Sequence, residues 1–488
     1  MKIKTHIRVL LVSTFITLFA YSGVMASERT NFTFDQVLQQ VVETYPSLKL
    51  AQLQVERARQ QMIQVESTLG WNLNAGAGVN HDVSFIGAPS DVADITAGLN
   101  KKLKSGDSFG VSGEYRYSDD SLTFGPTIPN PSHRTYLDLN YRMALGRGNE
   151  NPEYSQGLVS AEAGVMFEKA SELAVRDQLA NQTQELFYNA AKLRSRLATA
   201  QSAVIRAKRL KKYIKERQTL GLSEEKDMLQ ADAQYRSRLS NVKNLEVGWQ
   251  QVRTTLNRLM GLAWDHEFEP VVGRNKQYKQ SKQQLNTFIT EVENNSPDLL
   301  RTRARIKISE ADIVLRKDVR KDKFDVVVSV GTRTANGDAV AGSVSEQDMA
   351  GGLRLEYQRS LDQRGFDASL YQAQLDKQIA EDDNAKIRED LKYQVSGLVA
   401  EIDASQYSIE SFIARLKSEN LKFDDALKRY ELGRVETDRL IQFENELQTA
   451  RFELEDQRID YERRYKSLNI LRGKIWDDVT LPGYGEQK

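Results

Sequence analysis

Apolar and polar residues follow two different patterns along this chain. Between residues 71 and 145, apolar side chains occupy every second position, which is typical of strands with one apolar and one polar face. Leu137, Leu139, Tyr141 and Leu145 show this alternation clearly. Elsewhere apolar residues recur at helical spacing, as they do through 416–427. The pattern therefore predicts groups of strands separated by long helices.

The predicted helices are unusually long. A stretch of helical pattern without internal breakers suggests coiled coil once it is well beyond about 25 residues. At 1.5 Å per residue, the longest stretches would span roughly 100 Å. We expect helices near Phe34–Thr68, Pro152–Thr219, Gln283–Val319 and Phe366–Glu431, and two more that end at Gly261 and Gly473.

Four short motifs occur twice in the same order. The pattern L-N-x-L-x-G-x-x-W-D begins at Leu256 and again at Leu468, 212 positions later. The Leu-Gly pair at 220–221 returns at 432–433 with the same offset. A Leu-x-Leu-x-Tyr strand is offset by 216 positions (137 to 353) and a proline motif by 251 (46 to 297). The sequence therefore predicts a tandem duplication.

The duplication predicts a domain layout. The interval from the proline motif to the Leu-x-Leu-x-Tyr strand is longer in the first copy than in the second, by the difference between their offsets of 251 and 216 positions. We assign these additional residues to an additional hairpin near Ala93–Ser118. We predict a signal peptide at 1–26, a first repeat at 27–262 with strands 71–145 and a tip near 221, an equatorial linker at 263–282, a second repeat at 283–476 with strands 324–359 and a tip near 433, and a tail at 477–488.

The strands fit the wall of a membrane β-barrel. The turn at 104–107 is tight, whereas the connection at 119–134 is long and carries three prolines. Short turns on one side and long loops on the other are typical of outer-membrane barrels. In the second copy we expect two strands separated by a Gly- and Ala-rich loop at 334–347. A chain with four to six strands falls short of the eight or so that a single-chain barrel needs, so copies must associate.

Composition narrows the functional classes. The chain has 68 basic and 68 acidic residues, and this balance gives no reason to expect a nucleic-acid partner. Lys2, Lys4 and Arg8 precede an apolar stretch and a small-residue cleavage site, which predicts export by a signal peptide. There is no cysteine for a lipid anchor, and after the signal no apolar run is long enough for a transmembrane helix.

These features together resemble the TolC family of outer-membrane efflux proteins. The motifs at 45–48 and 296–299, the Leu-Gly tips and the L-N-x-L-x-G endings carry the resemblance, which covers the whole mature chain. It implies an α+β membrane protein whose homotrimer forms a β-barrel in outer-membrane lipid and an α-helical coiled-coil tunnel in the periplasm of a Gram-negative bacterium. The barrel would have 12 strands, or 18 if the additional hairpin joins.

The resemblance also implies partners and sites. The channel would passively receive substrate from an inner-membrane transporter through a periplasmic adaptor (a membrane fusion protein), in drug efflux or in type I secretion. Its adaptor-contacting tips would be Gly221, Leu222, Ser223, Gly433, Arg434 and Val435. Its periplasmic gate would include a contact between Asp227 and Tyr430, while Arg439 and Gln442 stand where family members carry an acidic entrance ring.

Other functions are less well supported by the residues. The four histidines are scattered, no H-E-x-x-H or P-loop motif occurs, and a cysteine nucleophile is impossible. We therefore expect no enzymatic activity, no catalytic residue, no metal site and no cofactor. A soluble periplasmic coiled-coil scaffold is the alternative, since a soluble sheet with one buried face would show the same alternation.

Overall fold

The computed structural model describes residues 30–83, 89–121, 125–273, 282–477 and 479. The predicted signal peptide at 1–26 lies outside these residues, as does most of the predicted tail. The chain divides into two compact units. Unit 1 comprises the N-terminal segment to Pro46, Arg176–Val292 and Tyr393–Lys488, and unit 2 comprises Ser47–Val175 and Glu293–Lys392. Each unit combines segments from both halves of the sequence.

Four described helices dominate the chain, and they match in pairs. Helices α3 (Pro152–Thr219) and α7 (Arg364–Glu431) have 68 residues each and run through both units. Helices α4 (Glu225–Leu259) and α8 (Thr437–Leu471) have 35 residues each. The long helices lie where the apolar spacing predicts them. None of the described helices is long and apolar enough to cross a membrane.

Each repeat is predicted to begin with one long helix, and in the structure this helix is divided in two in both repeats. Helix α1 (Phe34–Thr44) ends before α2 (Pro46–Ser67), and α5 (Lys282–Asn295) ends before α6 (Pro297–Val319). The prediction of one unbroken helix in each place is therefore wrong. Proline restricts the residue before it to extended backbone and is accepted only in the first turn of a helix, so it ends one helix and begins the next.

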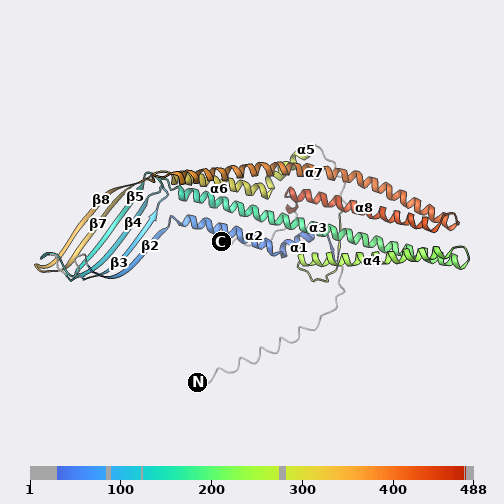
Figure 1. Ribbon diagram of the computed structural model, residues 1–488, viewed down its shortest axis with the longest axis horizontal. Helices are drawn as coiled ribbons and strands as arrows, with labels where there is room; N and C mark the ends of the chain where they lie inside the picture. The colour runs from blue at the N-terminus through green and yellow to red at the C-terminus, as the bar shows by residue number, and fades with distance from the viewer. Residues whose placement is uncertain (1–29, 84–88, 122–124, 274–281, 478, 480–488) are drawn as a thin grey trace, which may run out of the picture. The chain divides into compact units, whose positions relative to one another are not determined.

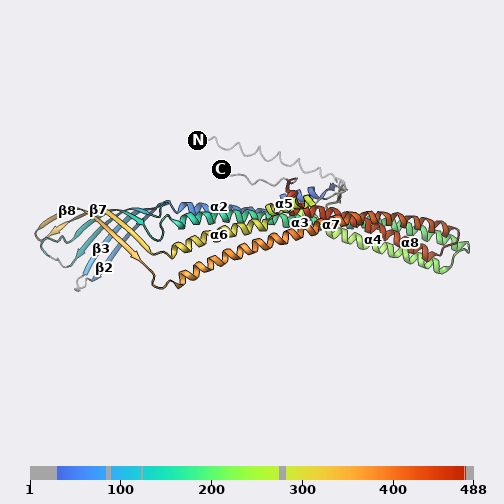
Figure 2. The same ribbon diagram turned by 90° about the horizontal axis from the view of Figure 1, so that it is seen from above.

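Unit 2 is built on one antiparallel sheet (Figure 1). Its six described strands pair in the order β2-β3-β4-β5-β7-β8. In both views α2, α6 and the adjoining parts of α3 and α7 run alongside one another, in the order α2-α3-α6-α7 (Figure 2). The strands are β2 (Trp71–Val83), β3 (Pro89–Lys102), β4 (Ser108–Asp120), β5 (Ser132–Ala144), β7 (Lys323–Ala339) and β8 (Gly342–Gln358).

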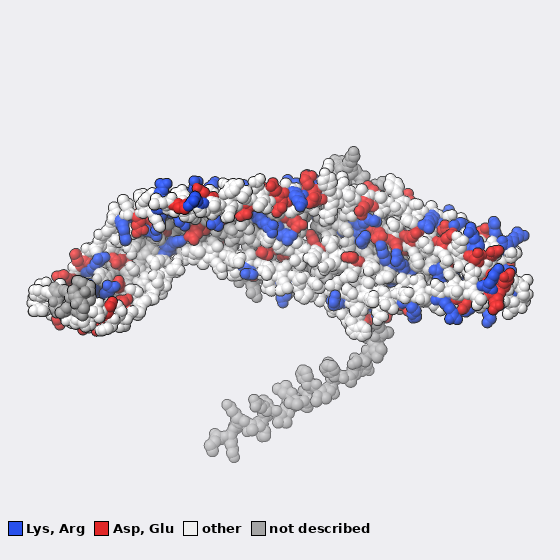
Figure 3. Space-filling model, in the orientation of Figure 1, with Lys and Arg blue, Asp and Glu red and all other residues white. Residues whose placement is uncertain are grey.

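The strand patterns place the apolar side chains on one face of this sheet. Leu73 and Val79 of β2 are 73% and 89% exposed, and Leu353 of β8 is 72% exposed. On the face of the molecule in Figure 3, uncharged atoms cover most of the strand region. The predicted loop at 334–347 is mostly strand, because β7 and β8 pair as far as Ala339 and Gly342. Its Gly and Ala residues therefore do not end the strands.

In unit 1, a parallel pair of short strands joins distant segments. Strand β1 (Thr30–Phe32) pairs with β6 (Phe268–Pro270), which lies within the predicted linker. The first L-N-x-L-x-G motif shapes the chain just before β6. Buried Asn257 donates to the His266 carbonyl at 2.9 Å, and Gly261 has a φ of +67°. A side chain at 261 would also collide with Thr44, so the motif is explained by the geometry of this loop.

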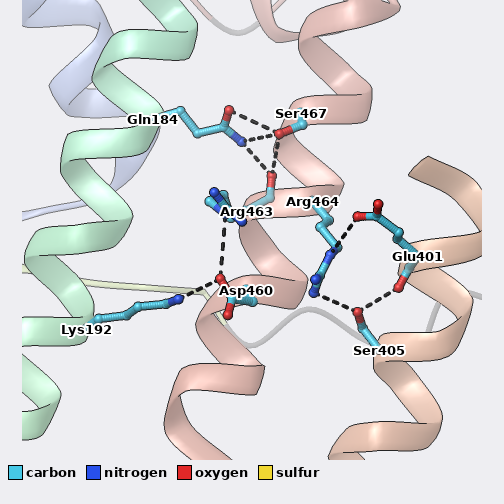
Figure 4. A network of polar contacts seen from close by, with 8 residues as sticks. All are labelled: Gln184, Lys192, Glu401, Ser405, Asp460, Arg463, Arg464 and Ser467. Carbon is cyan, nitrogen blue, oxygen red and sulfur yellow. Dashed lines mark hydrogen bonds and ion pairs between the residues drawn. The ribbon is translucent and has the colours of Figure 1, made fainter. Parts of the chain in front are cut away.

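Polar contacts connect α8 to the long helices on both sides of it in unit 1 (Figure 4). Lys192 of α3 pairs with Asp460 at 2.7 Å, and Gln184 donates to Ser467 at 2.9 Å. On the other side Arg464 donates to Ser405 of α7 at 2.9 Å. Partly buried bonds of this kind fix which residues of neighbouring helices face each other.

Candidate functional site

Each helical hairpin of unit 1 turns at a glycine. Between α3 and α4 this is Gly221, with a φ of +71°, and between α7 and α8 it is Gly433, with a φ of +70°. The amide of Leu222 donates to the Arg217 carbonyl, and the amide of Arg434 to the Arg429 carbonyl, both at 2.9 Å. This six-to-one bond is the Schellman ending of a helix, in which other residues would be strained.

The tips present apolar side chains to solvent. Leu220, Leu222 and Leu432 are 72%, 63% and 68% exposed. Of the predicted adaptor-contacting residues, Arg434 is also exposed, whereas Val435 packs against the apolar cluster beneath. These leucines give the end of an otherwise polar helical hairpin an exposed apolar surface. The geometry therefore sets Leu222 and Arg434 apart from Val435.

An apolar cluster holds the four helix ends together just behind the tips. Its buried members come from α3, α4, α7 and α8, with Tyr213, Phe423 and Val435 among the side chains packed around them. Such a cluster makes the two hairpins of the chain a single packed body. The buried members are Ile214, Ala231, Ala426, Tyr430 and Leu440.

Arg217 connects the two tips directly. Its Nη1 donates to the Tyr430 carbonyl at 2.8 Å, and its guanidinium lies 5.5 Å from the centre of the Tyr430 ring and 5.9 Å from that of Tyr213. Its Nη2 also lies 3.4 Å from the Leu222 carbonyl of its own tip. The pattern of the sequence gave no reason to select Arg217, because its partner is a backbone carbonyl of the other hairpin.

The predicted hydrogen bond between Asp227 and Tyr430 is not formed. Asp227 accepts from Ser223 Oγ at 3.0 Å and from the Glu224 amide at 3.2 Å, as the third residue of α4 in a capping box. The Tyr430 hydroxyl lies 3.0 Å from Thr437 Oγ1 at the start of α8. Each side chain thus closes its own hairpin. Burial raises the pKa of Tyr430, which remains a neutral hydrogen-bonding group.

The expected position of an acidic ring holds a mixed chain of polar contacts. Arg439 Nη1 donates to Gln442 at 2.8 Å, Gln442 donates to Glu446 at 2.9 Å, and Lys422 donates to Glu446 at 3.1 Å. The Lys422 ammonium lowers the pKa of Glu446. Positive and negative groups alternate here, so no acidic surface results.

The neighbouring acidic residue Glu444 points into the bundle. Its side chain is 6% exposed and pairs with Arg206 of α3 at 3.2 Å and with Arg238 of α4 at 2.8 Å. This buried triad joins three helices. It was not anticipated, because three residues on separate helices have no fixed spacing in sequence.

Comparisons with known proteins give matches at the level of structure. No family model and no curated protein matches the chain. The outer-membrane channel OprN superposes with a TM-score of 0.68 at 15% identity, over 90% of each chain. VceC of Vibrio cholerae, an outer membrane protein, gives 0.67 at 14%, over 90% of this chain and 96% of that one.

A third match represents a channel in its open state. The MtrE outer membrane channel of Neisseria gonorrhoeae gives a TM-score of 0.59 at 16% identity, over 91% of this chain and 89% of that one. All three neighbours are matched along nearly their whole length. The resemblance to the TolC family is thereby confirmed at the level of the fold: this chain has the fold of the outer-membrane channels.

Proposed function

We propose that this protein is one subunit of a homotrimeric outer-membrane channel of a Gram-negative bacterium. It provides a passive exit duct for substrates that an inner-membrane transporter delivers through a periplasmic adaptor, in efflux or in type I secretion. The fold shared with outer-membrane channels carries this proposal. The exposed apolar face of the sheet is the observation in the chain itself that supports it.

The outward face of the sheet suits lipid better than water. Leu355 and Tyr357 of β8 are 64% and 61% exposed, and Leu137 and Leu139 of β5 are 50% and 48% exposed. Leaving such side chains in water forfeits about 25 cal/mol for each Å² of apolar surface. A soluble scaffold would have to bury this face, whereas an outer-membrane strand places it against the hydrocarbon.

The edges of the sheet support assembly from several copies. Strands β2 and β8 are outermost, so each has a row of backbone groups that no described strand of the same chain pairs with. Such groups cannot remain unpaired in lipid. The helices that continue from these strands carry exposed apolar residues too: Leu50 and Leu53 on α2, and Tyr371 and Ile379 on α7. In a closed ring of three copies, β2 of each subunit would pair with β8 of the next, so that every edge has a partner.

The tandem repeat gives the subunit its internal arrangement. Equal lengths of α3 and α7 and of α4 and α8 support two repeats, at 27–262 and 283–476, joined by the linker at 263–282. We include the signal peptide at 1–26 and the tail at 477–488 in this division. The two repeats contribute unequal numbers of strands to the six-stranded sheet, four from the first and two from the second among the described residues.

The tips would meet the adaptor and control the periplasmic opening. Leu222, Arg434 and the turns around Gly221 and Gly433 form the proposed contact surface. In the closed state Arg217 would hold both tips of a subunit together, while Asp227 and Tyr430 stabilise the individual turns. Arg439 and Gln442 then line an opening without an acidic ring.

Membrane fractionation and electrical recording test the proposal together. The purified protein should sediment with outer membranes, run as a trimer in native detergent gels and insert conducting channels into planar bilayers. Recovery in the soluble periplasmic fraction would reject the channel in favour of the scaffold. A Leu222→Glu variant should keep the trimer and its conductance but lose export in cells, while Glu225→Gln on the same tip should be neutral.

A further inference from the structure

The additional hairpin of the first repeat lies in the middle of the sheet. Strand β3 pairs with β2 along its length, from Trp71 opposite Lys101 to Val83 opposite Pro89. Strand β4 pairs with β3 and with β5 in the same continuous manner. The hairpin is therefore no appendage on a four-stranded wall. Each of its two strands is paired on both sides.

The hairpin has the same two faces as its neighbours. On the outward face Ile95 and Leu99 of β3 are 59% and 42% exposed, and Tyr115 of β4 is 41% exposed. Thr96 and Ser112, at alternate positions, point to the opposite face with the polar residues of the other strands. A strand in a barrel wall needs this alternation, because its apolar side chains face the lipid and its polar side chains face the lumen.

The width of the sheet can be compared with that of the helices attached to it. Strands about 4.8 Å apart and tilted by about 40° each occupy roughly 6.3 Å of a barrel's circumference. The six described strands of one subunit then span roughly 38 Å. The four described helices of unit 2, α2, α3, α6 and α7, span roughly 38 Å at an interaxial distance of about 9.5 Å.

The two widths are similar, so six strands per subunit fit above these helices. From the continuous pairing of six strands in one chain we propose that the trimer forms an 18-stranded barrel, and that it serves substrates wider than a single α-helix. The inference rests on the trimeric channel proposed above. It adds the width of the pore and the size class of the substrate.

The diameter of the pore follows from the circumference of the barrel. An 18-stranded barrel of roughly 113 Å circumference has a backbone diameter of about 36 Å, which leaves about 25 Å between side chains. A 12-stranded barrel would leave about 13 Å, hardly more than the 10–12 Å of one helix. Small residues occupy many of the inward positions and keep the lumen open, among them Gly76, Gly98, Gly110, Ser112, Ser329 and Gly352.

Single cysteines test whether the hairpin forms part of the wall. The chain has no cysteine of its own, so an introduced thiol is the only one. In purified trimers in lipid, a charged, membrane-impermeant thiol reagent should modify Ser112→Cys and leave Val111→Cys unmodified. Equal modification of both would place the hairpin outside the barrel wall and overturn the inference. Leu139→Cys and Asn140→Cys provide the matched control pair, because their strand β5 belongs to the wall of both a 12-stranded and an 18-stranded barrel.

Removing residues 89–120 tests the width. The registers then bring β2 beside β5, with Leu73 facing Leu139 and Asn74 facing Asp138, so both faces are preserved. Neutral polymers of about 13–25 Å diameter, added on the barrel side, should enter the full-length channel and reduce its conductance. The shortened channel should exclude them.

Strand counts from electron cryomicroscopy of the full-length trimer complete the test. A trimeric channel with 12 strands, or one that excludes these polymers as the shortened variant does, refutes the inference and leaves the proposed function intact. Failure to form a trimer or a channel refutes the proposed function itself. If the shortened chain does not fold, the strand count and the cysteine pairs of the full-length protein still distinguish a barrel of 18 strands from one of 12.

Discussion

The buried triad around Glu444 offers the sharpest test of how the tips are held. Replacing Glu444 by Gln removes its charge and leaves Arg206 and Arg238 facing each other within the bundle. Their side chains are only 21% and 15% exposed. Breaking a buried ion pair by removing one partner costs about 3–5 kcal/mol, because the remaining charge is desolvated without compensation. We take the lower end, about 3 kcal/mol, because both arginines retain some solvent contact.

Hydrogen exchange measures this loss where it occurs. Amides of α8 near Glu444 exchange through local opening of the tip, and a loss of about 3 kcal/mol should accelerate them roughly 150-fold. Peptides from unit 2 should be unaffected, since they do not contain the triad. Glu446→Gln is the matched control, because Glu446 also accepts from a cation, Lys422, but its side chain is 35% exposed. Exposed pairs contribute about 0–1 kcal/mol, so the control should change exchange less than about fivefold.

The reasoning fails if the two substitutions have similar effects. It also fails if Glu444→Gln accelerates exchange only a few-fold, because the triad would then be solvated in solution. A Glu444→Leu variant separates charge from packing. If the buried arginines are the cause, leucine should be at least as destabilising as glutamine. A less destabilised leucine variant would mean that packing around position 444 outweighs the ion pairs.

Four other predictions concern single features of unit 1. Arg217→Met should raise the open probability of purified channels in planar bilayers by about tenfold or more, since a charge-assisted bond and two ring contacts are lost, each of about 1 kcal/mol; exposed Arg434→Met is the control. Gly433→Val should lower stability by about 1–2 kcal/mol, measured as accelerated tip exchange, because its φ is +70°. Asn257→Leu should destabilise the loop before β6 by about 1–3 kcal/mol in the same assay, since two carbonyls lose their donor. Hydrogen bonds from Lys211 and Arg236 lower the pKa of Asp232, so its contribution to stability is complete above the usual carboxyl range and is lost as the pH falls through the lowered pKa. Tip exchange in wild type and Asp232→Asn should therefore differ at neutral pH and converge once the pH falls below the lowered pKa.

Periodicity predicted the regular elements of this chain well. The alternation at 71–145 identified strands whose outward residues the structure leaves exposed, and helical spacing located α3 and α7 closely. The structure departs from these patterns where a single residue determines the local backbone conformation. Pro46 and Pro297 end helices whose apolar spacing continues across them. Gly and Ala at 334–347 suggested a loop, although cross-strand pairing in a wide sheet keeps this segment extended.

The tips show what a repeat pattern leaves undetermined. The positive φ of Gly221 and Gly433 follows from sequence, because a Leu-Gly pair at the end of a helix favours this ending. The partners of Asp227 and Tyr430 do not, because each has a local alternative, a capping box or Thr437, that only the backbone geometry selects. Arg217 and Glu444 act across separate helices, and their contacts depend on a register that spacing within one helix cannot specify.

The parallel pairing of β1 with β6 constrains the order in which the exported chain can fold. Thr30–Phe32 leave the translocation machinery first, but their partner strand at Phe268–Pro270 follows more than 230 residues later. Unit 1 also needs Tyr393–Lys488, so it can close only after nearly the entire chain has been synthesised and translocated. In the proposed export to the outer membrane, the strands at 71–144 would reach the periplasm during that interval with their apolar side chains uncovered. Such a chain should depend on periplasmic chaperones that hold unpaired strands, and their loss should lower the amount of folded protein in the outer membrane.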